Sequence, residues 1–260
     1  MPALNMLLEA VRVAQSPAWM PPNGALHGVV LDNLMQWNLI ALSVCFLAAH
    51  GWIIAAILRR RKFDQGSKQL ETAFRWATLT ALCAMYIWIA ITAQRLWAEN
   101  RFAGPALEAM QVEVVGEQFQ WYFRYPGQDA AFGATRPELV NAPGGNPIGL
   151  DTRDARGKDD IVSSILILPA GREVDIRLRS LDVIHGFFVP EMRLKQNAVP
   201  GLLLHVHFTP TVVGTYPILC SQVCGSGHAR MQAVLSVLPP ADFETWLTTH
   251  EQIRAQEIAP

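Results

Sequence analysis

Two long runs without charged residues constrain the fold of this chain more than any other feature. No Asp, Glu, Lys or Arg occurs from Asn33 to Leu58 or from Trp76 to Gln94. A helix of about 20 apolar residues is long enough to cross the hydrocarbon core of a bilayer. Both runs therefore predict transmembrane helices, which makes the lipid bilayer the first expected partner. A buried helical hairpin in a soluble protein is the alternative.

The segment between the two runs is basic. It reads RRRKFDQGSKQLETAFR, with six basic residues against Asp64 and Glu71. Short loops rich in Lys and Arg tend to stay in the cytoplasm, so both chain ends are expected outside. We divide the chain into an exported N-terminal segment (1–30), a transmembrane hairpin (31–98), a β-rich domain (99–240) and a C-terminal helix or tail (241–260). The first twenty residues fit either a signal peptide or an amphipathic segment.

After the second run the pattern changes to short alternating stretches, which are typical of half-buried strands. EVDIRLRS is one example, and VEVVGEQFQWYFRYPG, SSILILPAG, LLLHVHFTP, GTYPIL and MQAVLSVLP are others. Several short strands at this spacing predict an all-β sandwich or barrel of Greek-key type. Residues 126–163 are rich in Gly, Pro, Asn and Asp, which indicates a long excursion between strands.

The stretch CSQVCGSGHARM carries a metal-ligand pattern. Cys220, Cys224, His228 and Met231 follow one another at spacings of four, four and three, and His185 lies 35 residues upstream, at the end of an alternating strand. Thiolate, imidazole and thioether donors suit soft metals. A Cys2His2 zinc site leaves the methionine unexplained. Blue copper uses a single Cys, so the second thiolate favours a copper pair.

Two stretches carry a family resemblance, VIHGFFVPEMRLKQNAVPG and TPTVVGTYPILCSQVCGSGHARM. They resemble subunit II of the haem–copper cytochrome c oxidases, and two membrane helices before a β domain match that family as well. The resemblance implies a two-helix transmembrane hairpin followed by a cupredoxin-like Greek-key barrel. It also implies a binuclear copper centre, CuA, which accepts electrons from cytochrome c for reduction of oxygen in subunit I. The implied ligands are His185, Cys220, Cys224, His228, Met231 and the main-chain carbonyl of Gln222.

The same resemblance implies partners and a location. Subunits I and III of an oxidase are the expected protein partners, in a bacterial-type inner (plasma) membrane with the C-terminal domain on the outer side; no nucleic-acid partner is expected. Of 22 acidic and 21 basic residues, only 4 acidic and 8 basic lie in residues 1–98. The exported part therefore has 18 acidic and 13 basic residues, and this excess suits a basic donor such as cytochrome c.

The chain departs from the family pattern at several positions. The family's electron-accepting Trp aligns with Phe119, and Trp121 comes two residues later, so Phe119 is the candidate by position and Trp121 by chemistry. Gln222 replaces a Glu that binds magnesium at the boundary with subunit I, and Asn197 replaces a common Asp. An amide is a poorer ligand for Mg²⁺ than a carboxylate, so a weak or rebuilt magnesium site is expected. Glu71 resembles the family's proton-path carboxylate, although the helix dipole alone would favour an acid there.

Other readings of these residues stay open. Cys220 and Cys224 can be a disulfide, and Cys45 and Cys83 suit packing in apolar helices. His205 and His207 point to one face of a strand, as a second metal pair or as structural histidines. His50 lies within the first apolar run, as a functional or a packed imidazole. The whole chain can alternatively be a CuA subunit of a nitric oxide reductase, a copper-free quinol oxidase scaffold or a membrane-anchored copper-handling protein.

Overall fold

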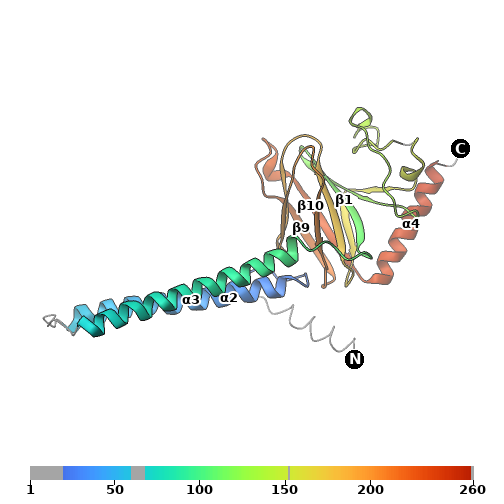
Figure 1. Cartoon of the computed structure of the whole chain (residues 1–260). Helices are drawn as coiled ribbons and strands as arrows, with labels where there is room; N and C mark the ends of the chain where they lie inside the picture. Colours follow the sequence, from blue (N-terminus) through green and yellow to red (C-terminus); the bar gives the residue numbers. More distant parts are fainter. Residues whose placement is uncertain (1–19, 60–67, 152, 259–260) are drawn as a thin grey trace, which may run out of the picture. The chain divides into compact units, whose positions relative to one another are not determined.

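The computed structural model describes residues 20–59, 68–151 and 153–258, as two compact units (Figure 1). One unit is helical and covers residues 30–103. The other holds the described part of residues 1–29 together with residues 104–258, and it contains all the strands. The predictions for residues 1–19, and most of the basic loop at 60–67, lie outside the described residues.

The two predicted transmembrane helices are present. Helix α2 spans Gly28–Arg59 and helix α3 spans Lys68–Arg101. Their apolar stretches, Gly28–Leu58 and Glu71–Glu99, have 31 and 29 residues and bury none of their most hydrophobic window inside the protein. At 1.5 Å per residue each is about 45 Å long, more than the hydrocarbon thickness of about 30 Å. Apolar side chains this exposed need lipid or partner helices around them.

Ten strands form the β domain as two five-stranded sheets. The first has the order β3-β2-β1-β5-β8 and the second the order β4-β10-β9-β6-β7. Their bounds in chain order are β1 Met110–Glu117, β2 Gln120–Tyr125, β3 Ile161–Ser163, β4 Ile165–Pro169, β5 Val174–Ser180, β6 His185–Val189, β7 Leu194–Ala198, β8 Leu204–Phe208, β9 Gly214–Cys220 and β10 Gln232–Leu238. β1 with β5 and β10 with β4 pair in parallel, and the other pairs are antiparallel. These elements confirm the expected fold class, two apolar helices followed by an all-β cupredoxin-like domain.

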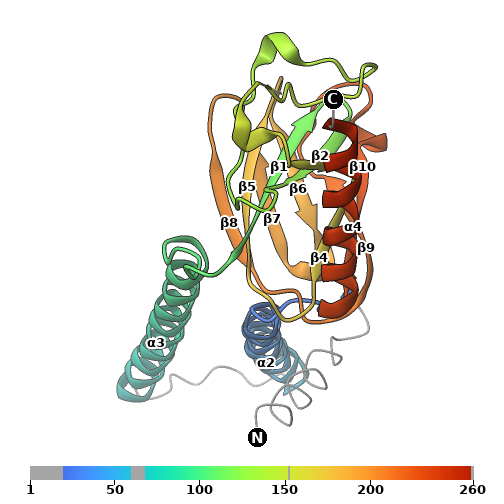
Figure 2. The same ribbon diagram turned by 90° about the vertical axis from the view of Figure 1, so that its right-hand side faces the viewer.

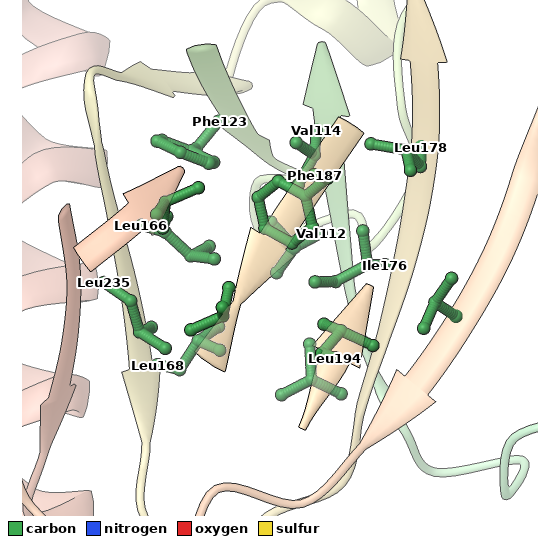
Figure 3. Close-up of a cluster of buried hydrophobic side chains, with 14 of the residues drawn as sticks. Val112, Val114, Phe123, Leu166, Leu168, Ile176, Leu178, Phe187, Leu194 and Leu235 are labelled. Atoms are coloured by element: carbon green, nitrogen blue, oxygen red, sulfur yellow. The ribbon is translucent and has the colours of Figure 1, made fainter. Parts of the chain in front are cut away.

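The hydrophobic core lies between the two sheets, as Figure 3 shows for ten labelled side chains. Val112 and Val114 of β1, Ile176 and Leu178 of β5 and Phe187 of β6 are at most 1% exposed. They alternate with polar neighbours along β1 and β5, as the sequence pattern predicts. Fully burying one such side chain contributes about 1.5–3 kcal/mol to folding.

Two strands were not anticipated. The predicted alternating segments all contain strands, and two of them, VEVVGEQFQWYFRYPG and SSILILPAG, each split into a pair. β6 (HGFFV) and β7 (LKQNA) lack a clear alternation, and the sequence reading missed them. His185 was expected at the end of an alternating strand, but that strand ends at Ser180 and His185 is the first residue of β6. Burial of β6 on both faces removes the period-two signal.

The predicted excursion and C-terminal helix are both present. Residues 126–160 contain two 3-10 turns, Pro137–Leu139 and Ala155–Gly157, and Ile148 and Leu150 pack with Val115 of β1 in a small second cluster. Helix α4, Pro240–Ile258, runs along the β domain (Figure 2), where Phe243 is fully buried and Trp246 meets the ring of Tyr125 at 5.0 Å.

Candidate metal centre

Three neighbouring strands of the second sheet bring the predicted ligands together. His185 begins β6, Cys220 ends β9, and Met231 directly precedes β10. The loop after Cys220 carries Cys224, and His228 begins a short 3-10 turn. Because β10, β9 and β6 are adjacent, residues 35 or more positions apart along the chain meet at one end of the sheet.

The donor atoms lie close enough to share metal ions. The two sulfur atoms of Cys220 and Cys224 are 3.7 Å apart. The Cys224 sulfur lies 3.8 Å from Nδ1 of His228 and 3.8 Å from the Met231 sulfur. The ligand atoms of His185, Cys220 and Cys224 are all within 4.8 Å of one another. The main-chain oxygen of Gln222 is 3.2 Å from the Cys220 sulfur.

His185, beside this cluster of sulfurs, has one ring nitrogen without a hydrogen-bond partner in the described part of the chain. Its side chain is fully buried, and Nε2 donates to Oδ1 of Asp182 at 2.8 Å. Nδ1 has no hydrogen-bond partner among the described residues. A buried polar atom without a partner is costly unless a ligand satisfies it. A metal-binding imidazole commonly donates its second nitrogen to a carboxylate in this way, so the residues present fit a bound metal.

Asp182 and Gln118 belong to the site, although the sequence analysis singled out neither. Oδ2 of Asp182 accepts the backbone N–H of Gln118 at 2.7 Å, and the Gln118 side chain donates to the carbonyl of Cys224 at 2.6 Å. Burial alone would raise the pKa of Asp182, but the hydrogen bond from His185 and those from two backbone N–H groups hold it below its usual value. An acid three residues before a candidate His ligand was the available sequence signal.

The geometry of the loop requires glycine at two positions. Gly225 has φ +141°, and a Cβ there would lie 2.9 Å from the Gln118 amide nitrogen. A Cβ at Gly186 would lie 2.4 Å from Oγ of Ser221 and 2.7 Å from the backbone nitrogen of Gln222. The loop thus approaches β6 at a distance that only a glycine allows.

The two thiols of the site are free, with Cys224 buried and Cys220 partly exposed. All four cysteines of the chain are free, so the disulfide alternative for Cys220 and Cys224 is not the state seen here. Burial, and then the neighbouring Cys220 thiol, raises the pKa of Cys224 to about 11. Cys224 is therefore a thiol at neutral pH in the metal-free protein. A soft metal ion would have to displace this proton, because the thiolate is the ligand.

The two candidate electron-accepting aromatics differ in exposure. Trp121 is fully buried, with its ring edge-on to His185 at 5.8 Å and to Phe187 at 5.3 Å. Phe119 is 36% exposed, and a Cβ on Gly227 would lie 2.3 Å from its ring, so the ring covers the loop that carries the cysteines. Phe119, the candidate by position, is therefore accessible to solvent, whereas the indole of Trp121 is not.

The other candidate residues from the sequence lie elsewhere along the chain than the clustered donors. Glu71 is exposed near the start of α3 and pairs with Arg75. His50 donates from Nδ1 to the carbonyl of Phe46 in its own helix at 2.8 Å. His205 and His207 on β8 each have a carboxylate at Nδ1, Asp175 at 2.9 Å and Glu173 at 3.0 Å. Cys45 and Cys83 are exposed on α2 and α3.

Comparison with known proteins identifies the family. A family model described as cytochrome c oxidase subunit II, periplasmic domain, matches residues 110–238. The alternative cytochrome c oxidase subunit 2 of Bradyrhizobium diazoefficiens is 35% identical over 244 residues, covering 89% of this chain and 84% of that protein. This chain belongs to the cytochrome c oxidase subunit II family. The predicted resemblance is thereby confirmed.

Other members of the subunit II family match over less of this chain. Cytochrome c oxidase subunit 2 of Thermostichus vulcanus is 34% identical over 149 residues, which covers 57% of this chain and 36% of that protein. Among solved structures, the periplasmic domain of subunit II of cytochrome oxidase from Bradyrhizobium japonicum is 23% identical, with a TM-score of 0.42, over 58% of this chain and 96% of that one.

Membership in the subunit II family has direct consequences. The chain is a subunit II of a cytochrome c oxidase, with two apolar helices long enough to cross a membrane. The chain itself offers a group of one His and two Cys at metal-binding distance, with His228 and Met231 beside it.

Proposed function

We propose that this subunit accepts electrons from cytochrome c and passes them to the haems of subunit I, where oxygen is reduced to water. The buried imidazole of His185, whose Nδ1 has no hydrogen-bond partner among the described residues and which lies within 4.8 Å of two free thiols, carries this proposal. The cofactor that suits these donors is the binuclear copper centre CuA. Bound there, such a centre would supply one-electron transfer with little change in ligand geometry.

The residues of this chain hold and insulate that centre. Cys220, Cys224, His185 and His228 would hold the metal centre. Met231 and the Gln222 carbonyl would supply weaker donors, in keeping with the thioether ligands of copper sites. Trp121 and the core behind it keep water from one side of the site, which favours fast electron transfer because less solvent must reorganise.

The intact donor set favours this function over a copper-free quinol oxidase scaffold. A scaffold without metal would leave Nδ1 of His185 and the Cys224 thiol buried without a metal to bind, and the unsatisfied nitrogen would cost stability. A subunit of a nitric oxide reductase and a copper-handling protein would need the same donors. The identity of the partner subunit would distinguish a nitric oxide reductase subunit. The rate of copper release would distinguish a copper-handling protein.

The test is an EPR and optical spectrum of the full chain in detergent, loaded with copper. Hyperfine structure from one unpaired electron shared by two equivalent copper ions is the expected result. A mononuclear copper spectrum, or a chain that takes up no copper, would contradict the proposed function. Zinc binding with four ligands and no visible absorption would point to a structural site instead.

Phe119 is the proposed electron-accepting residue, because it is exposed and its ring lies on the cysteine loop. In a stopped-flow assay with reduced cytochrome c and the assembled oxidase, Phe119→Leu should slow electron transfer into the centre and leave its spectrum unchanged. Trp121→Phe should alter the spectrum through His185 contacts more than it alters docking. If only Trp121→Phe slows the reaction with cytochrome c, the assignment to Phe119 is wrong.

Four further expectations belong to this proposal. The β domain lies outside a bacterial inner membrane, with Glu71 at the cytoplasmic end of α3 as a candidate mouth of a proton path into subunit I. Subunit III is an expected third partner. Any magnesium site at the subunit I boundary is weak, because Gln222 offers an amide where a carboxylate binds best.

A further inference from the structure

A cavity on the outer face of the first sheet contains a cluster of arginines that the proposed electron transfer does not use. The cavity has a volume of about 1030 Å³ and is lined by Arg124 of β2, Arg177 and Arg179 of β5, and Phe132 of the excursion, among others. Arg124, Glu113 and Arg177 face one another across β2, β1 and β5 in a single register row. This volume is in the range of pockets that bind small molecules.

Four arginines line the cavity; Arg156 pairs with Asp154 at 3.6 Å, and two of the three on the strands are also already neutralised. Nε of Arg124 lies 2.8 Å from a Glu113 oxygen, and its Nη1 lies 3.2 Å from Asp160. Arg179 binds the other oxygen of Glu113 at 3.0 Å. Both carboxylates are almost completely buried, so neither has a free surface to offer a third cation.

Arg177 has no such partner. Its guanidinium makes no hydrogen bond or ion pair with any described residue, and its Nε is buried from solvent. Its Cζ lies 4.8 Å from the centroid of the Phe132 ring, and Cζ of Arg124 lies equally far from that centroid. An unpaired guanidinium held among two others costs free energy, and an anion that reaches it removes that cost.

The other charges in the cavity limit what can bind. Glu117 and Asp182 line its far end. Glu117 is four residues beyond Glu113 on β1, about 13 Å along the strand. Asp182 is already committed to His185 and the backbone of Gln118. Glu117 and Asp182 would repel a ligand with negative charge at both ends. A ligand with a single anionic head at Arg177 is not repelled at the far end.

A partly apolar wall adjoins the arginines. Pro200, Leu202 and Leu203 line the cavity, and the two leucines are 53% and 44% exposed. Pro200 forms a bridge with Ser180, three residues after Arg177. A ligand held by its head at Arg177 can therefore cover these leucines with an apolar portion.

We propose that this cavity is a binding site for a small molecule with one oxyanion head, a carboxylate or a phosphate, held by the guanidinium of Arg177 with its apolar part toward Leu202 and Leu203. The planar fork of an arginine matches either head group with two parallel hydrogen bonds. The site is independent of the copper ligands, so its test does not depend on the proposed electron transfer.

The experiment measures the unfolding temperature of the full chain in detergent against anion concentration, at constant ionic strength with chloride as the balancing salt. The probes are inorganic phosphate, acetate and butyrate, because a ligand that binds only the folded state raises the unfolding temperature in a saturable way. We expect saturable stabilisation by at least one probe. Among the carboxylates, butyrate should bind several-fold more tightly than acetate if the leucines take part.

The Arg177→Gln variant should weaken binding by about tenfold or more, since a charge-assisted pair is lost. Arg172→Gln is the matched control, because Arg172 is an exposed arginine 3.9 Å from Glu244 and lies outside the cavity. If Arg177→Gln does not fold, Arg177→Lys is measured instead. It keeps the positive charge but loses the planar guanidinium, so anions should raise its unfolding temperature less than that of the wild type.

Each outcome decides the proposal. A response to phosphate alone assigns the site to phosphate-bearing molecules, and a response to the carboxylates alone assigns it to organic acids. The proposal fails if no probe stabilises the wild-type chain beyond chloride, or if Arg177→Gln and Arg172→Gln respond as the wild type does.

Discussion

Replacing Asp182 should weaken copper binding without touching a copper ligand. Its carboxylate accepts from Nε2 of His185 at 2.8 Å, from the Gln118 N–H at 2.7 Å and from the Val183 N–H at 2.6 Å. Removal of the carboxylate frees the buried imidazole to turn, so Nδ1 no longer points steadily at the sulfurs. Loss of such a supporting hydrogen bond typically lowers metal affinity about 10- to 100-fold. That loss corresponds to about 1.4–2.8 kcal/mol.

Two substitutions separate the hydrogen bond from the charge. Asp182→Ala should fall near the upper end of that range, because the buried ring then has no acceptor. Asp182→Asn keeps one oxygen but presents an NH2 group to a second donor, so we expect a loss nearer tenfold. Copper affinity is measured by competition with a chelator of known affinity, and the unfolding temperature of the metal-free protein is measured alongside.

The control is Asp129→Ala, which removes an exposed carboxylate that accepts from the Ala131 N–H away from the site. Its copper affinity should equal that of the wild type. Wild-type affinity in a folded Asp182→Ala variant would refute the supporting role of Asp182. A fall in affinity matched by global unfolding of that variant would show a structural role only.

Three other predictions concern the same centre. Cys220→Ser should abolish the shared-electron EPR spectrum, whereas Cys45→Ser, in the helical unit, should leave it intact; a normal spectrum in the first variant would remove Cys220 from the ligand set. Because the raised pKa of Cys224, about 11, keeps its thiol protonated at neutral pH, copper must displace that proton, and apparent affinity should rise about tenfold per pH unit from pH 6 to 8. A flat titration over that interval would contradict the bound proton. Gly186→Ala should displace the cysteine loop, lower the unfolding temperature and weaken copper binding, while Gly104→Ala, with nothing within 4 Å of a new Cβ, should change neither; equal effects of the two would show that the close approach does not matter.

The sequence was sufficient to predict the helices and most strands, because hydrophobic periodicity reports burial directly. β6 was not predicted because of the same burial that encloses His185 in the site. His185 and its neighbours are buried on both faces, which leaves no alternation to detect. The tight turns at β1–β2 were also hidden, because Gln118 and Phe119 interrupt a segment that otherwise alternates.

The ligand spacing could be predicted, but the surroundings of the ligands could not. Spacing alone indicated a soft-metal site, since Cys, His and Met fall within one loop. The partners Asp182 and Gln118 depend on where β1, β5 and β6 end relative to one another, which is a property of the sheets. Arg177 likewise reads as an ordinary outward-facing residue of an amphipathic strand. Its lack of a counterion becomes visible only when the excursion covers the sheet.

The donors are carried by, or lie beside, β6, β9 and β10, so the metal site can form only after these strands have paired. His185 and Met231 meet only after strands far apart in sequence have paired, so a ribosome-bound chain that lacks β10 has no complete site. The backbone of the site is then held by the sheet hydrogen bonds of β9 with β10 and of β6 with β9. Under the proposed function, copper would therefore join a scaffold that the strands have already formed, unlike the zinc of a zinc finger, whose removal unfolds the protein. A chelator should strip the metal and leave a folded acceptor that a copper donor can refill.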